Sequence, residues 1–457
     1  MLRDELAQFA TSLRFRDLPA SSISAAKRLL IDHLSVMLAG PRAFGSGLLD
    51  LRDFVRKQGG QPDSTLLGVS GRYPCLGAAL ANTTLGLGID AWHKPSALHA
   101  SGVLIPATLA VAEWRRASGR DLVTALVAGT EIMTRLGMAL GAAALYERGF
   151  HPTSVCGPLG CAVAAAKLLG LDVSRMAEAI SISAPLGAGS SVWAGSRTPT
   201  SWWFQVGRAA QSGVHAAQLA EHGCEGVGPI FEDPRGVLAG FSGHIDTMSL
   251  TEGLGARYEI ERIMMYRLWF GPYLLTSIET LLELMTLHGL QAEDIESITA
   301  RLPSPVMPLV GYSEYPENGL AALTSTRYAL AVTSYLREDA FFSIDTSTPA
   351  YLEDPRVRAL FERVKIEADT ELDSLFPDIL PSIVTLVTRD GRQFTERNDG
   401  PVKGDPENPL SDTDLEAKFN AMARPVLEDS RADRLLDAIH QLETIEDVSD
   451  VVQLLGH

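Results

Sequence analysis

Hydrophobic residues recur at spacings of three and four along most of the first 260 residues, which predicts one helix after another. The segments with this pattern are 19–40, 102–119, 121–141, 157–172, 174–184 and 206–223. The first has serines for an N-cap and Gly40 as its expected end. Several are apolar nearly all round, which is typical of helices buried inside a large helical core.

The pattern changes after about Ile263. Segment 295–302 alternates as a half-buried strand does, and 381–397 contains two alternating runs around Asp390-Gly391, which predicts a hairpin. Helices are expected at 273–289 and 319–336, and again at 409–427, where Ser411 is the N-cap, and 430–445.

We therefore predict a mainly α protein, with a large all-helical domain and a smaller α+β lid domain inserted late in the chain. The helical main domain takes residues 1–265 and the lid takes 266–405. The C-terminal helices, 406–457, rejoin the helical domain. Small-molecule sites tend to lie in clefts between such domains.

Composition narrows the class of partner. The net charge of −17 and the lack of a basic patch argue against nucleic acid. The N-terminus carries charges where a secretory signal is apolar, and no apolar run reaches the roughly 18 residues of a membrane span. Four cysteines without CxxC spacing (Cys75, Cys156, Cys161, Cys224) are expected to be buried free thiols in a reducing compartment. We expect a soluble, cytoplasmic protein with no membrane partner.

The stretch from Gly88 to Gly102 concentrates titratable side chains between two apolar segments. His93 and His99 are six residues apart across a proline, so a loop presents them, and Asp90 is placed to orient an imidazole. The alternative is that these side chains only cap helices around Pro95. No HExxH pattern is present, and no metal site is predicted.

A second stretch, 146–160, places His151 just before an Ala/Gly-rich helix. A helix N-terminus favours a substrate carboxylate or a developing enolate, and its field keeps a histidine neutral and basic. A simple capping loop is the alternative here.

Aromatic residues form a third group. Trp193, Trp202 and Trp203 surround Arg197, as an aromatic wall with one cation or as interdomain packing. Other side chains placed to reach a cleft, or equally to lie on the surface, are Tyr266, Arg267, Tyr273, Ser325, Arg327 and Tyr328. The chain has no phosphate loop, Rossmann glycine pattern or GxSxG elbow, so no nucleotide or redox cofactor is expected.

Taken together, these stretches resemble the MmgE/PrpD superfamily of 2-methylcitrate dehydratases and cis-aconitate decarboxylases. The resemblance runs nearly end to end, through "LLIDHLSVMLAG", "HASGVLIPATLAVAE", "RGFHPTSVCGPLGCAVAAAKLLGLD", "GRAAQSGVHAAQLAEHG" and "KGDPENPLSDTDLEAKF". It implies a helical domain with an α+β lid, usually a homodimer, and a cofactor-free active site between the domains. Members dehydrate 2-methylcitrate, decarboxylate cis-aconitate or epimerise iminodisuccinate, and each moves a proton next to a carboxylate.

The resemblance also suggests residues. His99 falls on the histidine of "HPSG"-like loops, His151 on that of "GFHP", and His93 on one found in decarboxylases. Of the usual aspartate-rich loop only Asp90 remains. A lysine that is common in the family is absent, and Trp202 or its neighbours occupy its place. Tyr273 stands where a histidine is common in the family. These losses argue against a small tricarboxylate substrate unless Arg197 or Lys94 replaces the cation.

The sequence thus indicates a lyase or isomerase that abstracts a proton alpha to a carboxylate or carbonyl of a partly hydrophobic substrate. His99 and His151 would be the acid/base pair, oriented by His93 and Asp90. The expected substrate-binding residues are Lys94, Ser101, Thr153, Ser154, Arg197, Trp202, Trp203, Tyr266, Tyr273, Arg327 and Tyr328. The alternatives are a 2-methylcitrate dehydratase or cis-aconitate decarboxylase on a tricarboxylate, and a catalytically inactive member with a binding role.

Overall fold

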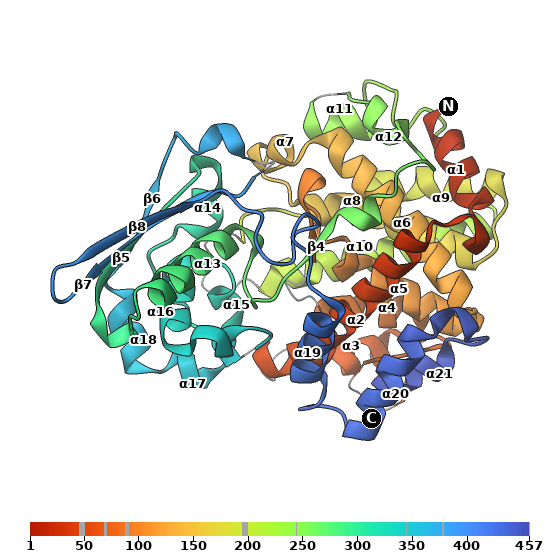
Figure 1. Ribbon diagram of the computed structural model, residues 1–457. Coiled ribbons are helices and arrows are strands. Elements are labelled where there is room, and N and C mark those ends of the chain that lie inside the picture. Colours follow the sequence, from red (N-terminus) through yellow and green to blue (C-terminus); the bar gives the residue numbers. More distant parts are fainter. Residues whose placement is uncertain are drawn as a thin grey trace.

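A large helical domain and a smaller α+β lid lie side by side in the computed structural model, and both chain ends lie on the helical domain (Figure 1). The structure describes residues 1–44, 51–67, 71–86, 91–193, 200–243, 245–343, 345–376 and 379–456. This arrangement confirms the predicted mainly α fold, with one small mixed sheet between residues 295 and 398.

The helical domain is built from twelve α-helices in the described residues. They are α1 (Leu2–Ser12), α2 (Ala20–Phe44), α3 (Leu51–Gln58), α4 (Cys75–Gly86), α5 (Ala100–Arg115), α6 (Gly119–Leu140), α7 (Ala142–Glu147), α8 (Pro152–Leu168), α9 (Val173–Ser183), α10 (Thr200–Glu221), α11 (Val237–Ser242) and α12 (Met248–Thr251). Helix α2 continues past Gly40, its predicted end, because one glycine inside a helix costs only about 1 kcal/mol.

This domain is not purely helical, which corrects the sequence prediction. Two short antiparallel pairs are present, β1 (Ser64–Thr65) with β2 (Arg72–Tyr73), and β3 (Ala91–His93) with β4 (Ile263–Met265). Strands of two or three residues are too short to produce an alternating pattern. The second pair joins the predicted histidine loop to the point where the chain leaves for the lid.

Helix α8 lies at the centre of the helical domain, in contact with α5, α6, α9 and α10. Glycines make this possible, since a Cβ on Gly129 of α6 would lie 2.8 Å from the carbonyl oxygen of Gly160. Helix α6 is itself long and apolar enough to span a membrane, although no such segment was expected. It is a core helix here, with 94% of its most apolar window buried.

The lid combines six α-helices with a four-stranded sheet. The elements are α13 (Pro272–Leu287), α14 (Met307–Val310), α15 (Gly319–Ala322), α16 (Thr326–Leu336), α17 (Pro349–Leu352), α18 (Pro355–Phe361), β5 (Ile295–Leu302), β6 (Val364–Ala368), β7 (Ser382–Thr388) and β8 (Gln393–Asn398). The strand order is β6-β5-β7-β8, parallel only between β5 and β6. The sheet lies at the outer edge of the lid, with α13 and α16 packed against it (Figure 1).

The expected hairpin and strand are present as β7–β8 and β5. The single helix expected over 319–336 is instead two, α15 and α16. The Ser325 side chain accepts a hydrogen bond from the backbone N–H of Tyr328 and so starts a new helix, which the hydrophobic pattern alone did not show.

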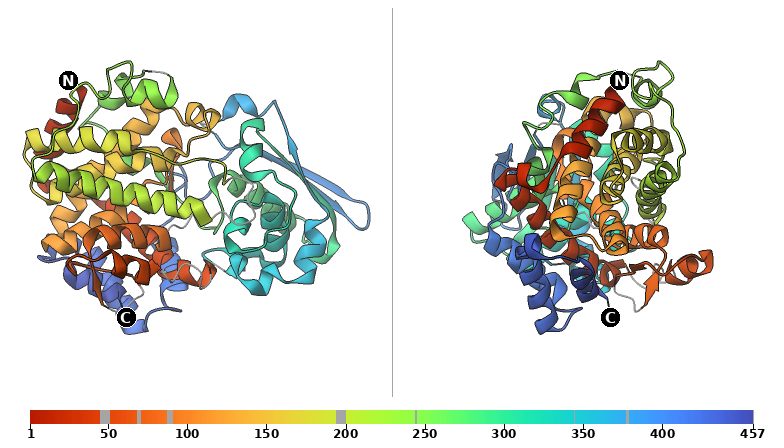
Figure 2. Two further views of the ribbon diagram at one scale, coloured as in Figure 1. Left: turned by 180° about the vertical axis from the view of Figure 1, so that it is seen from behind. Right: turned by 90° about the vertical axis from the view of Figure 1, so that its right-hand side faces the viewer.

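The last segment contains α19 (Asp412–Ala423), α20 (Asp429–His440) and α21 (Ser449–Val452), which lie on the helical domain (Figure 2). Ser411 caps α19 as predicted, in a capping box with Asp414. Helix α19 packs on α2, where the buried Lys418 ammonium pairs with Asp32 at 2.5 Å.

Three cysteines are buried free thiols as predicted, and burial raises the pKa of Cys75 to about 12. Cys224 is exposed, which corrects the prediction for that residue. It follows the end of α10 in a surface turn, where local apolar composition does not determine burial.

The close packing around α8 makes a testable prediction. A Cβ on Gly213 of α10 would lie 2.4 Å from the carbonyl oxygen of Pro158, so Gly213→Ala is expected to destabilise the protein by about 1–3 kcal/mol. Gly240→Ala in α11 is the control, because nothing lies within 4 Å of its added Cβ. Urea unfolding measures both; equal stability of the two variants would contradict the packing argument.

Candidate active site

Two histidines stand at the starts of neighbouring helices. His99 is the N-cap of α5 and His151 is the N-cap of α8, and neither caps the helix through its own side chain. The backbone N–H of His99 donates to the Thr153 hydroxyl oxygen at 3.1 Å, which joins the two helix starts. Neither imidazole therefore serves as a helix cap, unlike in the simple capping alternative.

The His99 ring has a defined orientation. Its Nδ1 lies 2.9 Å from the carbonyl oxygen of Ala91, which only accepts hydrogen bonds, so Nδ1 carries a proton. In the neutral ring Nε2 then holds the lone pair. His99 is half-buried, whereas His151 is buried.

His151 is held neutral. Its Nε2 accepts the indole N–H of Trp202 at 3.3 Å, and its Nδ1 therefore carries the proton and donates to the Ser154 oxygen at 2.8 Å. Burial, followed by the charge of His99, lowers the pKa of His151 to about 3. In this arrangement the ring takes up a proton only if Trp202 moves.

The three tryptophans expected near Arg197 lie together, and two of them contact His151. Trp193 stacks on Trp202 with ring centroids 4.2 Å apart, and both meet the His151 ring edge-on. Trp203 packs against Trp202 at 5.6 Å. This cluster keeps water from one side of His151. The predicted site residues Arg197 and Asp90 lie outside the described residues.

The lid contributes Tyr273, from the first turn of α13. Its ring meets Trp92 of β3 edge-on at 5.6 Å, and its phenol is hydrogen-bonded to that of Tyr146 on α7. Burial raises the pKa of Tyr146 to about 12, so both phenols stay protonated. Sequence reasoning missed Tyr146, although it lies five residues before His151 in the same stretch.

His93 is turned into a different environment. It is buried, with Nδ1 2.6 Å from the Ser96 hydroxyl and Nε2 3.0 Å from the Glu259 carboxylate. Although burial raises the pKa of Glu259, the hydrogen bond from His93 and the charges and hydrogen bonds of Arg262 and Arg257 lower it to about 2. Burial lowers the pKa of His93, so a neutral ring donates to Glu259. Both ring nitrogens are thus occupied within the protein.

Other predicted substrate-binding residues do not join the two histidines. Lys94 pairs with Asp405 at 2.9 Å and lines a separate cavity of about 290 Å³. Inside the lid, Arg327 donates to the carbonyl oxygens of Val364, Ser313 and Phe361, and the Tyr328 hydroxyl donates to that of Thr346.

Tyr266 is fully buried beside β4. Ser101 lies buried in the first turn of α5, two residues after His99. Across the part of the chain that is described, no three His, Cys, Asp or Glu side chains gather as ligands for a metal ion.

Comparison with known proteins agrees with this architecture. The model of the MmgE/PrpD N-terminal domain matches residues 4–248, and that of the MmgE/PrpD C-terminal domain matches residues 273–444. The chain belongs to the MmgE/PrpD family.

Relatives extend over the full length. Mouse cis-aconitate decarboxylase is 28% identical over 100% of this chain and 94% of its own length. The human cis-aconitate decarboxylase is 27% identical over 100% and 95%. A cis-aconitate decarboxylase-like protein of Aspergillus oryzae is 26% identical over 99% and 96%. This MmgE/PrpD member is thus similar along its whole length to proteins named as cis-aconitate decarboxylases or decarboxylase-like.

The His151 geometry predicts a specific tautomer. At pH 7 the ring is expected to be neutral with its proton on Nδ1, and Trp202→Phe is expected to let the Nε2–H form appear, because the indole donor is removed. Trp193→Phe is the control, since the Trp193 indole N–H has no partner among the described residues. Ring 15N NMR shifts distinguish the forms; an Nε2–H ring in the unaltered protein would contradict the assignment.

His151 also predicts how stability depends on pH. Its pKa in the folded protein, about 3, lies below the unfolded value of about 6.5, so the unfolded chain binds the extra proton between them. The free energy of unfolding is therefore unaffected by this titration above pH 6.5, and it falls as the pH is lowered toward 3, by at most about 1.4 kcal/mol per pH unit. Urea unfolding from pH 7 to 5 is expected to show a shallower decline for His151→Phe. The same change at the exposed His222 should leave the profile as it is.

Proposed function

We propose that this protein is a cofactor-independent lyase that moves a proton on the carbon next to a carboxylate or carbonyl of a partly apolar substrate. The observation that carries the proposal is the pairing of His99 and His151 at two joined helix starts, with unlike hydrogen bonding at the two rings. Similarity to named decarboxylases supports lyase chemistry.

His99 is the group that exchanges the proton in this proposal. The Ala91 carbonyl holds its Nδ1 proton, so Nε2 takes a proton from carbon or, once protonated, returns one. In a decarboxylation, loss of carbon dioxide leaves an electron pair on the substrate. The imidazolium of His99 then donates its proton to that carbon, and the neutral imidazole takes up a new proton from water.

His151 acts without changing its charge. Because its Nδ1–H donates to the Ser154 oxygen, the Ser154 hydroxyl proton is left for another acceptor, such as a substrate oxygen. The start of α8 adds a field that favours negative charge there. In this proposal His151 and Ser154 therefore hold and polarise the carboxylate or carbonyl of the substrate, while His99 exchanges the proton.

The surroundings favour a substrate with an apolar part. Trp193 and Trp202 exclude water beside His151, and the described cations named above are already engaged, Lys94 by Asp405 and Arg327 by lid carbonyls. A polyanion would need further cations to offset the loss of its hydration. We propose a cytoplasmic homodimer as the working form, in line with the family resemblance.

Decarboxylation of cis-aconitate is the second candidate. The specific observation in its favour is that both mammalian cis-aconitate decarboxylases align with 100% of this chain. A catalytically inactive binding protein is the remaining alternative. The hydrogen bond from His99 Nδ1 to the Ala91 carbonyl orients the ring as a base needs, and this favours an active enzyme.

Variants of His99 test the proposal. The protein is incubated with cis-aconitate, 2-methylcitrate and more apolar unsaturated or hydroxylated acids, and mass spectrometry follows loss of water or carbon dioxide. His99→Asn keeps a donor for the Ala91 carbonyl but removes Nε2, and is expected to lower kcat by about 10²–10⁴-fold. His222→Asn on the surface is the matched control.

The outcomes separate the candidates. Preferred turnover of an apolar acid supports the leading proposal, and preferred turnover of cis-aconitate supports the second candidate. Retention of full activity by His99→Asn would sink the proposed role of His99. Binding of acids without turnover of any would favour the inactive alternative.

A further inference from the structure

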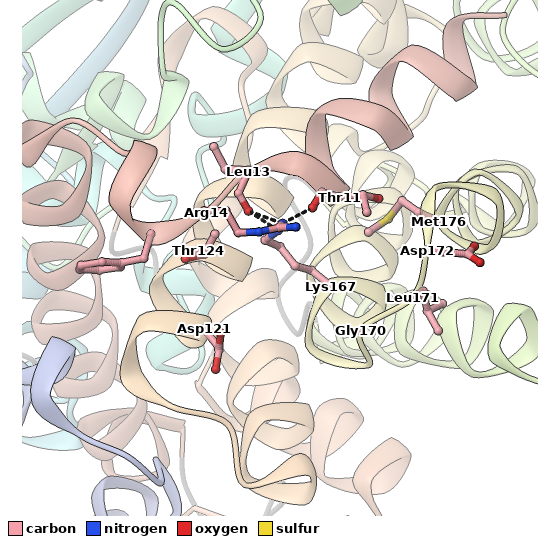
Figure 3. Close-up of a pocket in the computed structure, with 11 residues that line it drawn as sticks. Thr11, Leu13, Arg14, Asp121, Thr124, Lys167, Gly170, Leu171, Asp172 and Met176 are labelled. Carbon is pink, nitrogen blue, oxygen red and sulfur yellow. Dashed lines mark hydrogen bonds between the residues drawn. The ribbon is translucent and has the colours of Figure 1, made fainter.

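A second polar cavity lies at the opposite end of α8 from His151. It has a volume of about 410 Å³ and lies where the end of α1, the start of α6, the end of α8 and the start of α9 meet (Figure 3). A helix of 17 residues is about 25 Å long, so this cavity is remote from the histidine pair. Its volume falls within the range of small-molecule sites.

Two cations line this cavity, the half-buried Lys167 and the exposed Arg14. The Lys167 ammonium donates to the carbonyl oxygens of Ala10 and Leu13, both at 2.7 Å, and Arg14 Nη1 donates to those of Thr11 and Leu13. Both side chains thus lie within one hydrogen bond of the same Leu13 oxygen, as Figure 3 shows. Like charges this close repel each other, and burial followed by the Arg14 charge lowers the pKa of Lys167 to about 8.

The nearby carboxylates form no ion pair with these cations in the described part of the chain. Asp121 and Asp172 also line the cavity, and the Asp121 charge only partly offsets the effects that lower the pKa of Lys167. Asp121 is engaged in the capping box of α6 with Ser118, and Asp172 accepts the backbone N–H of Arg175 at the start of α9.

Unused hydrogen-bonding capacity remains at the same place. An ammonium has three N–H donors, and Lys167, which is half-buried, uses two of them. Arg14 is exposed, and its Nε and Nη2 have no acceptor among the described residues, so both remain open to a ligand from solvent. The Thr11 hydroxyl oxygen also lines the cavity, is shielded from solvent and has no described partner. The Thr11 hydroxyl is the member of this set that is buried without a partner, and such groups are rare and point to a group that completes them.

We propose that this cavity binds a compact oxyanion with two negative charges, phosphate or a small dicarboxylate, between Arg14 and Lys167. The anion accepts from the guanidinium, the ammonium and the Thr11 hydroxyl, and it links α1 to the end of α8. Because the chain carries a net charge of −17, such binding depends on these local cations rather than on overall attraction.

Titration calorimetry with the full chain tests the site, using inorganic phosphate and, separately, malonate. One anion per chain is expected to bind, and Arg14→Gln is expected to weaken it about tenfold, as loss of a charge-assisted hydrogen bond does. Arg16→Gln is the matched control, because Arg16 is two residues away, exposed and outside the cavity. Chloride at equal ionic strength controls for screening.

A second readout avoids variants that fail to fold. Lys167 is expected to be methylated readily by formaldehyde and cyanoborohydride at pH 7.5, and phosphate is expected to protect it, as peptide mass spectrometry reports. Stronger binding of phosphate or of malonate identifies which oxyanion the site prefers. Three results would each overturn the proposal. The first is that neither phosphate nor malonate gives a binding heat above that of chloride at equal ionic strength. The second is that Arg14→Gln and Arg16→Gln have equal effects on binding, and the third is that chloride protects Lys167 as well as phosphate does. None of these results depends on enzymatic turnover.

Discussion

Close packing around α8 holds the two ends of that helix in place, and the rest of the helical domain is arranged to permit it. A Cβ on Gly157 would lie 3.1 Å from Ala209 of α10 and 3.2 Å from Val103 of α5, so small residues let these helices approach. Because interiors packed at this density are hardly compressible, the position of one helix fixes the positions of its neighbours. The start of α8 carries His151, and its neighbour α5 begins just after His99.

The two histidines are chemically unlike because their surroundings differ. His99 bonds to a backbone carbonyl, which fixes the proton on Nδ1, and it keeps partial exposure. His151 is buried beneath tryptophans, and an indole N–H occupies its second nitrogen. Burial and the charge of His99 both lower the pKa of His151, so the His151 ring remains a neutral hydrogen-bonding group, and proton exchange is proposed for His99 alone.

The chain passes between its two domains beside the segment that contains β3 and His99. Strand β4 pairs with β3 on the way out, and on the return the Gly404 carbonyl accepts the backbone N–H of Met265. A Cβ at Gly404 would lie 1.8 Å from the Met265 oxygen, so only glycine permits the contact. Together with the Tyr146–Tyr273 phenol pair, these contacts anchor the lid next to His99.

By itself the sequence determined the helical class, the hairpin at Asp390-Gly391, the Ser411 cap and the two stretches that contain His99 and His151. These features follow from local periodicity, turn chemistry and motif spacing, which act over a few residues. The tertiary structure decided which candidates meet. It brought Tyr146 and Tyr273 together, enclosed His93 with Glu259, and kept Arg327 and Tyr328 inside the lid. It also placed Arg14 and Lys167, 153 positions apart in the chain, on one carbonyl oxygen. Contacts of this kind depend on helix packing across long separations, and no local pattern encodes them.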